Sequence, residues 1–130
     1  YVGSDLLAGN DSTVLKFAEE TLHFIPRTGH AVRTGKVYAT DYARPHFEGS
    51  FSFNTGFSPS VYTVEAPDAI EPAGKGAVCS FRYSENNSSA GVAYRGGYNN
   101  VITGFPFESI PDEKARDVLM NQILEFLNMK

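Results

Sequence analysis

Four side chains in this chain are candidates for hydrolytic chemistry, namely Ser4, His46, Glu48 and Glu108. A serine hydroxyl becomes a nucleophile when a histidine accepts its proton and a carboxylate orients that histidine. Ser4 lies in a Gly-Ser-Asp segment that is similar to part of a nucleophile elbow, but it lacks the glycine two residues later that the sharp turn requires. Turn and capping roles for Ser4 and Asp5 are therefore favoured.

Glu108 follows a predicted strand and precedes a predicted helix, the edge at which open α/β sheets place ligands. A structural interpretation competes with a functional one. A carboxylate near a helix start interacts favourably with the free backbone N–H groups and the helix dipole there. The structural role is favoured for Glu108.

The other reactive side chains indicate packing rather than catalysis or metal binding. Cys79 is the only thiol and falls in the middle of a predicted strand on an apolar face, where a buried thiol is inert. The three histidines lack the spacing of a zinc site, so no metal is expected; they are His23, His30 and His46. No glycine-rich phosphate loop is visible, so no cofactor is expected.

The arginines and the aromatic residues can each be interpreted as functional or as structural. Arg82 and Arg95 lie on adjacent predicted strands, where solvated pairing with Glu65, Glu85 or Glu108 is the common outcome. The chain has 7 tyrosines and 10 phenylalanines, which could provide a stacking surface for sugar rings. Such residues more often fill or flank the core.

Length and composition predict one compact domain. The chain has 130 residues, of which 42% are hydrophobic and 20% charged, and a formal net charge of -4. Its basic residues are scattered, so nucleic acid is not an expected partner. No apolar run approaches the roughly 20 residues that a membrane helix needs. One cysteine is compatible with both a reducing cytosol and disulfide-poor bacterial export.

The first half of the chain predicts a helix followed by strands. Residues 12–24 show helical spacing, with Val14, Phe17, Ala18 and Thr21 on the face that would cover a sheet. Residues 31–40 read as a strand interrupted at Gly35, so helix and strand together suggest half of a βαβ unit. Its first strand is expected just before Tyr1, and this sequence is expected to lack it.

The second half predicts a β-meander and a final helix. Strands are predicted within 47–57 and 61–64, and residues 67–76 are predicted to form a loop or a short edge. Three strands then follow within 77–103, with Gly96-Gly97 as a tight turn and Ala77, Cys79, Phe81 and Tyr83 on one face. Pro111 is placed in the first turn of the final helix, with Ser109 as candidate cap and Asp112 pairing with Arg116.

Three segments carry a resemblance to a known family: residues 1–6, 90–94 and 101–110, followed by Arg116, Leu119 and Met120. With these segments the chain resembles the C-terminal α/β domain of secreted Bacteroidetes proteins described as xanthan lyases, over nearly its whole length. That domain is similar in layout to flavodoxin-like and class I glutamine amidotransferase-like sheets. The resemblance implies a mixed sheet with flanking helices, at the C-terminal end of a larger multidomain protein.

The resemblance also implies a location, a partner and a missing reaction. It places the parent protein outside the cytoplasm or on the cell surface of a Gram-negative bacterium, with polysaccharide and its own upstream domains as partners. In the amidotransferase layout, a strand and turn just upstream of Tyr1 would hold the nucleophile, and no cysteine stands near that position. The His46-Phe47-Glu48 match to the amidotransferase His-x-Glu pair falls too early in the chain. A catalytically silent copy of an enzyme fold is implied.

Three hypotheses follow from the sequence. The first is a non-catalytic accessory domain of an exported polysaccharide-processing protein. The second is a hydrolase-type enzyme with a degenerate amidotransferase-like site, built on Ser4 or an upstream residue with His46 and Glu48 or Glu108. The third is a carbohydrate-binding module that uses exposed tyrosines.

Overall fold

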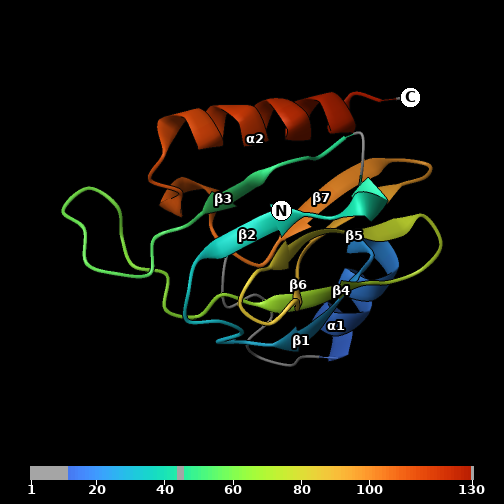
Figure 1. The fold of residues 1–130 in the computed structure, drawn as a ribbon. Coiled ribbons are helices and arrows are strands. Elements are labelled where there is room, and N and C mark those ends of the chain that lie inside the picture. The colour runs from blue at the N-terminus through green and yellow to red at the C-terminus, as the bar shows by residue number, and fades with distance from the viewer. Residues whose placement is uncertain (1–11, 44–45, 130) are drawn as a thin grey trace.

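The computed structural model describes residues 12–43 and 46–129, which form a mixed α/β domain (Figure 1). Its helices are α1 (Ser12–Phe17), the π-helical turn η1 (Ala18–Leu22), the 3-10 turns η2 (Asp41–Ala43) and η3 (Phe107–Ser109), and α2 (Glu113–Leu127). Its strands are β1 (Phe24–Thr28), β2 (Lys36–Ala39), β3 (Ser50–Ser52), β4 (Ala69–Pro72), β5 (Ala77–Tyr83), β6 (Ser89–Arg95) and β7 (Asn99–Thr103).

The described strands form two antiparallel sheets. The larger has five strands in the order β3-β2-β5-β6-β7, and the smaller pairs β1 with β4. The predicted meander is confirmed, because β5, β6 and β7 are consecutive neighbours. The tight turn at Gly96-Gly97 is confirmed as well, because the last ladder pair before it joins Arg95 to Asn99.

The two faces of the larger sheet are covered by different elements (Figure 1). Ala93 and Val101 face α2 and pack with Leu119, Ile123 and Phe126 of that helix. The neighbouring residues Val92 and Ile102 face the other way, toward a second cluster with Ala18, Phe24 and Ile70. This alternation follows from the period of two along a strand, so the meander has a helix on one face and the β1–β4 ribbon with η1 on the other.

The N-terminal half differs from the predicted βαβ unit. The helix ends before Pro26 as predicted, but the next strand, β1, pairs antiparallel with β4 in a separate sheet and contains Pro26 itself. The predicted strand over 31–40 shortens to β2, which is antiparallel to both of its neighbours. Every described strand pair is antiparallel, so the mixed sheet is wrong for these residues and the flavodoxin-like layout is not confirmed.

The packing face of the first helix also differs from the helical pattern. Ala18 is fully buried, whereas Val14 is 40% and Phe17 is 52% exposed. The wider turn of η1 lies between residues 18 and 22, and it brings Leu22 beside the buried cluster. A π-turn inserts an extra residue relative to an α-helix, so a regular period of 3.6 misplaces the residues around it.

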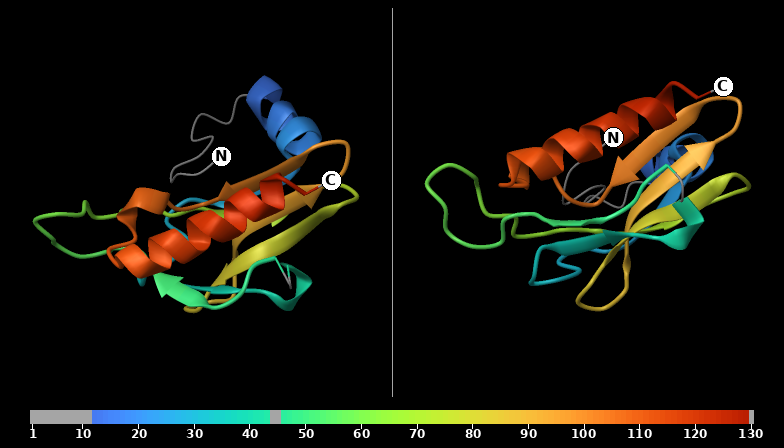
Figure 2. Two further views of the ribbon diagram at one scale, coloured as in Figure 1. Left: turned by 90° about the horizontal axis from the view of Figure 1, so that it is seen from above. Right: turned by 45° about the horizontal axis from the view of Figure 1, so that its top comes forward.

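Residues 47–64 form little regular structure. The predicted strand over 47–57 is reduced to the three residues of β3, and no strand is assigned at 61–64. The segment after Phe53 is a loop that projects beyond the sheet (green in Figures 1 and 2). Its base is closed by a backbone hydrogen bond of 2.9 Å from the Val64 amide to the Asn54 carbonyl. The Asn54 side-chain amide donates to the carbonyls of Gly56, Val61 and Tyr62, so one side chain organises the loop.

The sequence predicted a loop or a short edge for residues 67–76, and this segment contains the short strand β4. Next to it, Gly104 approaches the chain so closely that an added Cβ would lie 2.1 Å from the Asp68 carbonyl oxygen. Asp68 donates its amide to the Gly104 carbonyl, which ties β4 to the end of β7. Only glycine permits that approach.

The final helix is confirmed, but its start differs. Asp112, not Ser109, is the N-cap, and its side chain accepts hydrogen bonds from the amides of Lys114 and Ala115. Ser109 is buried and donates its hydroxyl to the Pro106 carbonyl, while Pro111 precedes the cap. Arg116 donates to the Ile110 carbonyl at 2.6 Å instead of forming the predicted pair with Asp112. An exposed ion pair contributes little to stability, so the partly buried bond to the carbonyl replaces it at little cost.

Candidate functional site

The predicted hydrolytic residues do not converge among those that the structure describes. Ser4 lies outside the described residues. His46 lies after η2 with its ring 5.4 Å from the Phe126 ring, near the C-terminal end of α2. Glu48 is exposed in the loop that leads to β3.

Glu108 lies at the opposite end of α2, in η3, where its carboxylate accepts a 2.9 Å hydrogen bond from the Tyr62 hydroxyl. The 15 residues of α2 lie between Glu108 and the end of the helix near His46. At a rise of about 1.5 Å per residue, that helix is roughly 20 Å long. Two side chains that act together in acid–base catalysis must lie within about 3 Å of the groups with which they exchange protons. His46 and Glu108 are therefore too far apart to act in one catalytic site.

Glu108 holds the projecting loop instead of serving a helix start. Partial burial, the hydrogen bond to Glu108 and the charge of Glu108 together raise the pKa of Tyr62 to about 12. A tyrosine of ordinary pKa is already protonated at neutral pH, so the raised pKa extends this hydrogen bond into the alkaline range. The Tyr62–Glu108 contact joins the loop of residues 54–64 to η3.

Cys79, His23 and His30, the other reactive side chains considered from the sequence, contact neighbouring residues of the fold. Cys79 is buried, with its Sγ 3.2 Å from both the Phe81 carbonyl and the Ser89 hydroxyl. His23 stacks on Tyr94 at a ring distance of 3.6 Å. His30 donates from Nδ1 to the Glu65 carbonyl. In the described part of the chain, no group of three acidic, histidine or cysteine side chains could hold a metal ion.

One concave surface is a groove between β4 and the strands β5 and β6, lined by charged and polar as well as apolar residues. It consists of two hollows of about 390 and 330 Å³ that share Glu71, Arg82 and Ser89 in their linings. One hollow reaches Tyr42 and the other reaches the turn at Asn86 and Asn87. Small-molecule sites typically have volumes of about 300–1,000 Å³, so each hollow is of that size. We call this surface the β4–β5 groove.

A β-bulge in β5 places Arg82 in this groove. Cys79 pairs with Val92 and Phe81 pairs with Gly91, so Ser80 is an extra residue in β5. The register shifts again between Phe81 and Arg82. Strict alternation would put Cys79 and Arg82 on opposite faces, whereas both line the same hollow. Bulges that redirect a side chain occur often beside functional sites.

The same bulge corrects the predicted face of β5. Phe81 and Tyr83 belong to the cluster under α2, whereas Ala77 packs with the cluster on the other face. The four residues that simple alternation grouped together are therefore divided between the two faces.

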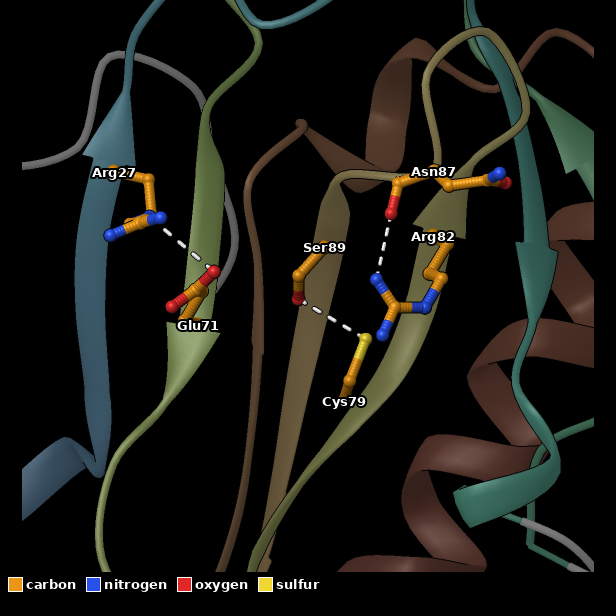
Figure 3. A network of polar contacts seen from close by, with 6 residues as sticks. All are labelled: Arg27, Glu71, Cys79, Arg82, Asn87 and Ser89. Carbon is orange, nitrogen blue, oxygen red and sulfur yellow. Dashed lines mark hydrogen bonds and ion pairs between the residues drawn. The ribbon is translucent and has the colours of Figure 1, made fainter.

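Figure 3 shows the charges of the β4–β5 groove and their partners. Arg27 and Glu71, on β1 and β4, form an ion pair of 3.3 Å across the ribbon. Arg82 donates from Nη1 to the Asn87 carbonyl at 2.7 Å, and it forms no ion pair with another described residue. The expected pairing of Arg82 with a glutamate is thus wrong. Glu85 instead accepts from the amides of Arg33 and Thr34.

An exposed aromatic ring stands at one end of the groove. Tyr42 is 73% exposed and lines the larger of the two hollows, that of about 390 Å³. It also lines a smaller, mostly apolar hollow of about 160 Å³ together with His46, Arg95 and Phe126. His46 thus lies on the far side of Tyr42 from Arg82.

From the sequence, Arg82 was predicted only as a pairing residue, and Tyr42 was one of the tyrosines that could stack on a sugar ring, without a position that singled it out. The groove lies between β4 and β5, and β4 is held in place by its pairing with β1. Hydrophobic periodicity does not reveal which strands pair, so the sequence did not predict the groove. One local signal was present. Asn86-Asn87-Ser88 forms the turn that supplies the carbonyl for Arg82, and Asn87 has the positive φ of 60° that asparagine tolerates.

The fold and groove define an α/β domain with antiparallel sheets and a polar surface groove. No family model, curated protein or solved structure matches the chain. None of the helices in the described residues is long and apolar enough to cross a membrane.

Proposed function

We propose that this chain is a non-catalytic accessory domain of a secreted polysaccharide-processing protein, in which it acts beside upstream domains of the same chain. The family resemblance of residues 90–94 and 101–110 supplies the polysaccharide context and the location outside the cytoplasm. The observation that carries the non-catalytic part is the placement of His46 and Glu108 at opposite ends of α2. The flavodoxin-like or amidotransferase-like relationship enters only through the resemblance.

A turnover assay tests this proposal. The purified domain is incubated with xanthan and other acidic polysaccharides, and both unsaturated uronate products and new reducing ends are measured. We expect no turnover above that of buffer. Turnover that disappears in His46→Ala or Glu108→Ala would overturn the proposal and favour the hydrolase-type alternative.

A second candidate function, carbohydrate binding, is favoured by the β4–β5 groove. An exposed tyrosine at the end of a groove lined by arginine, glutamate, serine and asparagine offers an apolar ring face beside hydrogen-bonding groups. Sugar rings present the same combination of C–H faces and hydroxyls. Calorimetry with neutral and acidic oligosaccharides tests this function, and the absence of heat with every one would count against it. Binding is compatible with the non-catalytic role.

A further inference from the structure

The β4–β5 groove has an electrostatic preference that follows from its ion pair. Glu71 is the carboxylate of the groove, and Arg27 neutralises it at 3.3 Å. Arg82 lies in both hollows and has no acidic partner among the described residues. The groove therefore carries one uncompensated positive charge, which favours an anionic ligand.

The Arg82 guanidinium is held in a defined orientation. The bulge in β5 directs Arg82 into the groove, and the 2.7 Å bond from Nη1 to the Asn87 carbonyl fixes one arm of the side chain. A guanidinium has five N–H donors in a planar fork, so one such bond leaves donors for a ligand. A planar carboxylate matches this fork better than a point anion does.

The neighbouring groups suit a ring that bears hydroxyls. The exposed Tyr42 ring lines the larger hollow together with Arg82 and provides an apolar face there. Ser89 and Asn87 also line the groove on the side of Arg82, where the Ser89 hydroxyl is held by the Cys79 thiol and the Gly91 carbonyl and the Asn87 side chain accepts from the Tyr38 hydroxyl. Glu71, on the opposite wall, accepts hydrogen bonds.

We propose that the β4–β5 groove binds a saccharide that carries a carboxylate, with the carboxylate on Arg82 and a sugar ring against Tyr42. This inference rests on the carbohydrate-binding function and names the class of sugar. It involves no bond making or breaking. Hydrogen bonds between a guanidinium and a carboxylate are charge-assisted, so Arg82 is expected to supply at least tenfold in affinity.

The test is calorimetry with uronic acid oligomers and their methyl esters, in which each carboxylate is replaced by an uncharged ester. The probes are oligogalacturonate, oligoalginate and an oligomer that contains glucuronate. We expect at least one acid form to bind at least tenfold more tightly than its ester. Arg82→Ala should remove this preference, and Arg82→Lys should restore only part of it because lysine lacks the fork. Tyr42→Ala should weaken the acid and ester forms alike.

Arg33→Ala is the matched control, since Arg33 is an exposed arginine that lines neither hollow of the groove. It lowers the net charge as Arg82→Ala does and should leave the acid preference unchanged. Circular dichroism checks that every variant is folded, and Arg82→Gln replaces Arg82→Ala if the shorter side chain unfolds the β5–β6 turn.

The possible failures are distinguishable. Equal binding of acids and esters, or acid binding that Arg82→Ala and Arg33→Ala reduce alike, would overturn the assignment to Arg82 while leaving carbohydrate binding in place. No heat with any neutral or acidic saccharide would remove carbohydrate binding and this inference together. Neither result touches the non-catalytic role, which the turnover assay tests separately.

Discussion

At the scale of single residues, Ser80 is the residue that sets the face of Arg82. As the extra residue of the bulge, Ser80 has no cross-strand partner in the β5–β6 register. Its hydroxyl is fully buried and has no hydrogen-bond partner among the described residues. The backbone irregularity that directs Arg82 into the groove thus coincides with a buried polar group, which costs free energy of folding.

Ser80→Ala should therefore raise the free energy of unfolding by about 1 kcal/mol, because alanine removes an unpaired buried hydroxyl. Ser89→Ala is the matched comparison, since Ser89 is also buried but its Oγ contacts the Cys79 thiol and donates to the Gly91 carbonyl. Ser89→Ala should lower the free energy of unfolding by about 1 kcal/mol. Urea denaturation followed by circular dichroism measures both. Equal losses in the two variants would show that the Ser80 hydroxyl has a partner.

Tyr62 predicts a change of stability at alkaline pH. Its pKa is raised from 10.0 to about 12 in the folded protein by partial burial, the hydrogen bond to Glu108 and the charge of Glu108. Between these two pH values the unfolded tyrosine has lost its proton and the folded one has kept it. The unfolded state then binds fewer protons, so the contribution of Tyr62 to stability is present below pH 10 and is lost toward pH 12.

Glu108→Gln tests this origin. It removes the negative charge but keeps an oxygen acceptor, so the pKa of Tyr62 should fall toward its ordinary value while remaining above it because of burial. Ultraviolet absorbance of the phenolate measures the titration, with Tyr62→Phe identifying which transition belongs to Tyr62. Buried Tyr83 also has a raised pKa, for which burial is the main cause, and it should not respond to Glu108→Gln. An unchanged Tyr62 titration in Glu108→Gln would contradict the contact.

At the scale of elements, the stability of α2 depends on Asp112, the N-cap residue just before the helix. Asp112 Oδ1 accepts from the Lys114 amide at 2.9 Å and from the Ala115 amide at 3.3 Å. These amides have no intrahelical acceptor, so Asp112→Ala should lower the free energy of unfolding by about 1 kcal/mol. Asp112→Asn keeps the accepting oxygen and should lose much less. A thermal or urea unfolding series measures both, and equal losses would assign the effect to charge on the helix dipole instead.

The elements that the sequence predicted correctly are those whose pattern is local. The strand lengths of the β5–β6–β7 meander and the helical spacing of α2 are set by adjacent residues, and a glycine pair marks the turn between β6 and β7. Of the predicted site, Glu108 was correctly placed before the final helix, but its Tyr62 partner comes from a distant loop. Local patterns contain no information on such contacts.

The elements that the sequence missed depend on distant partners. Pro26 signals a break, yet it lies in β1 because β1 has β4 as its only described neighbour, and a proline is tolerated on such an edge strand. The bulge at Ser80 changes the face of Arg82 with no glycine or proline in β5 itself, and Gly91, which marks it, lies on the partner strand β6. The β4–β5 groove needs both features, so it became visible only in three dimensions.

At the scale of the whole molecule, one face of the larger sheet packs under α2 and the other borders the β4–β5 groove. The groove with Arg82 lies on the side of the β1–β4 ribbon, whereas the cluster under α2 contains the larger set of buried aromatic rings. Phe47, Phe81 and Phe126 meet there, with the Phe47 ring 5.2 Å from the Phe81 ring and 5.5 Å from the Phe126 ring. Stability should therefore depend most on the α2 face, and ligand binding on the other.

Phe126→Ala tests this division. Phe126 is 4% exposed, and truncating a buried phenylalanine typically lowers the free energy of unfolding by about 3–5 kcal/mol. That loss is a large fraction of the roughly 5–15 kcal/mol available to a domain. Leu127→Ala is the control, because Leu127 is 41% exposed on the same helix and should cost less than about 1 kcal/mol. Urea denaturation gives both values. Similar losses of unfolding free energy in the two variants would show that α2 is not anchored through Phe126. A large difference, with unchanged saccharide affinity in the folded Phe126→Ala variant, would show that the α2 face provides stability separately from the groove.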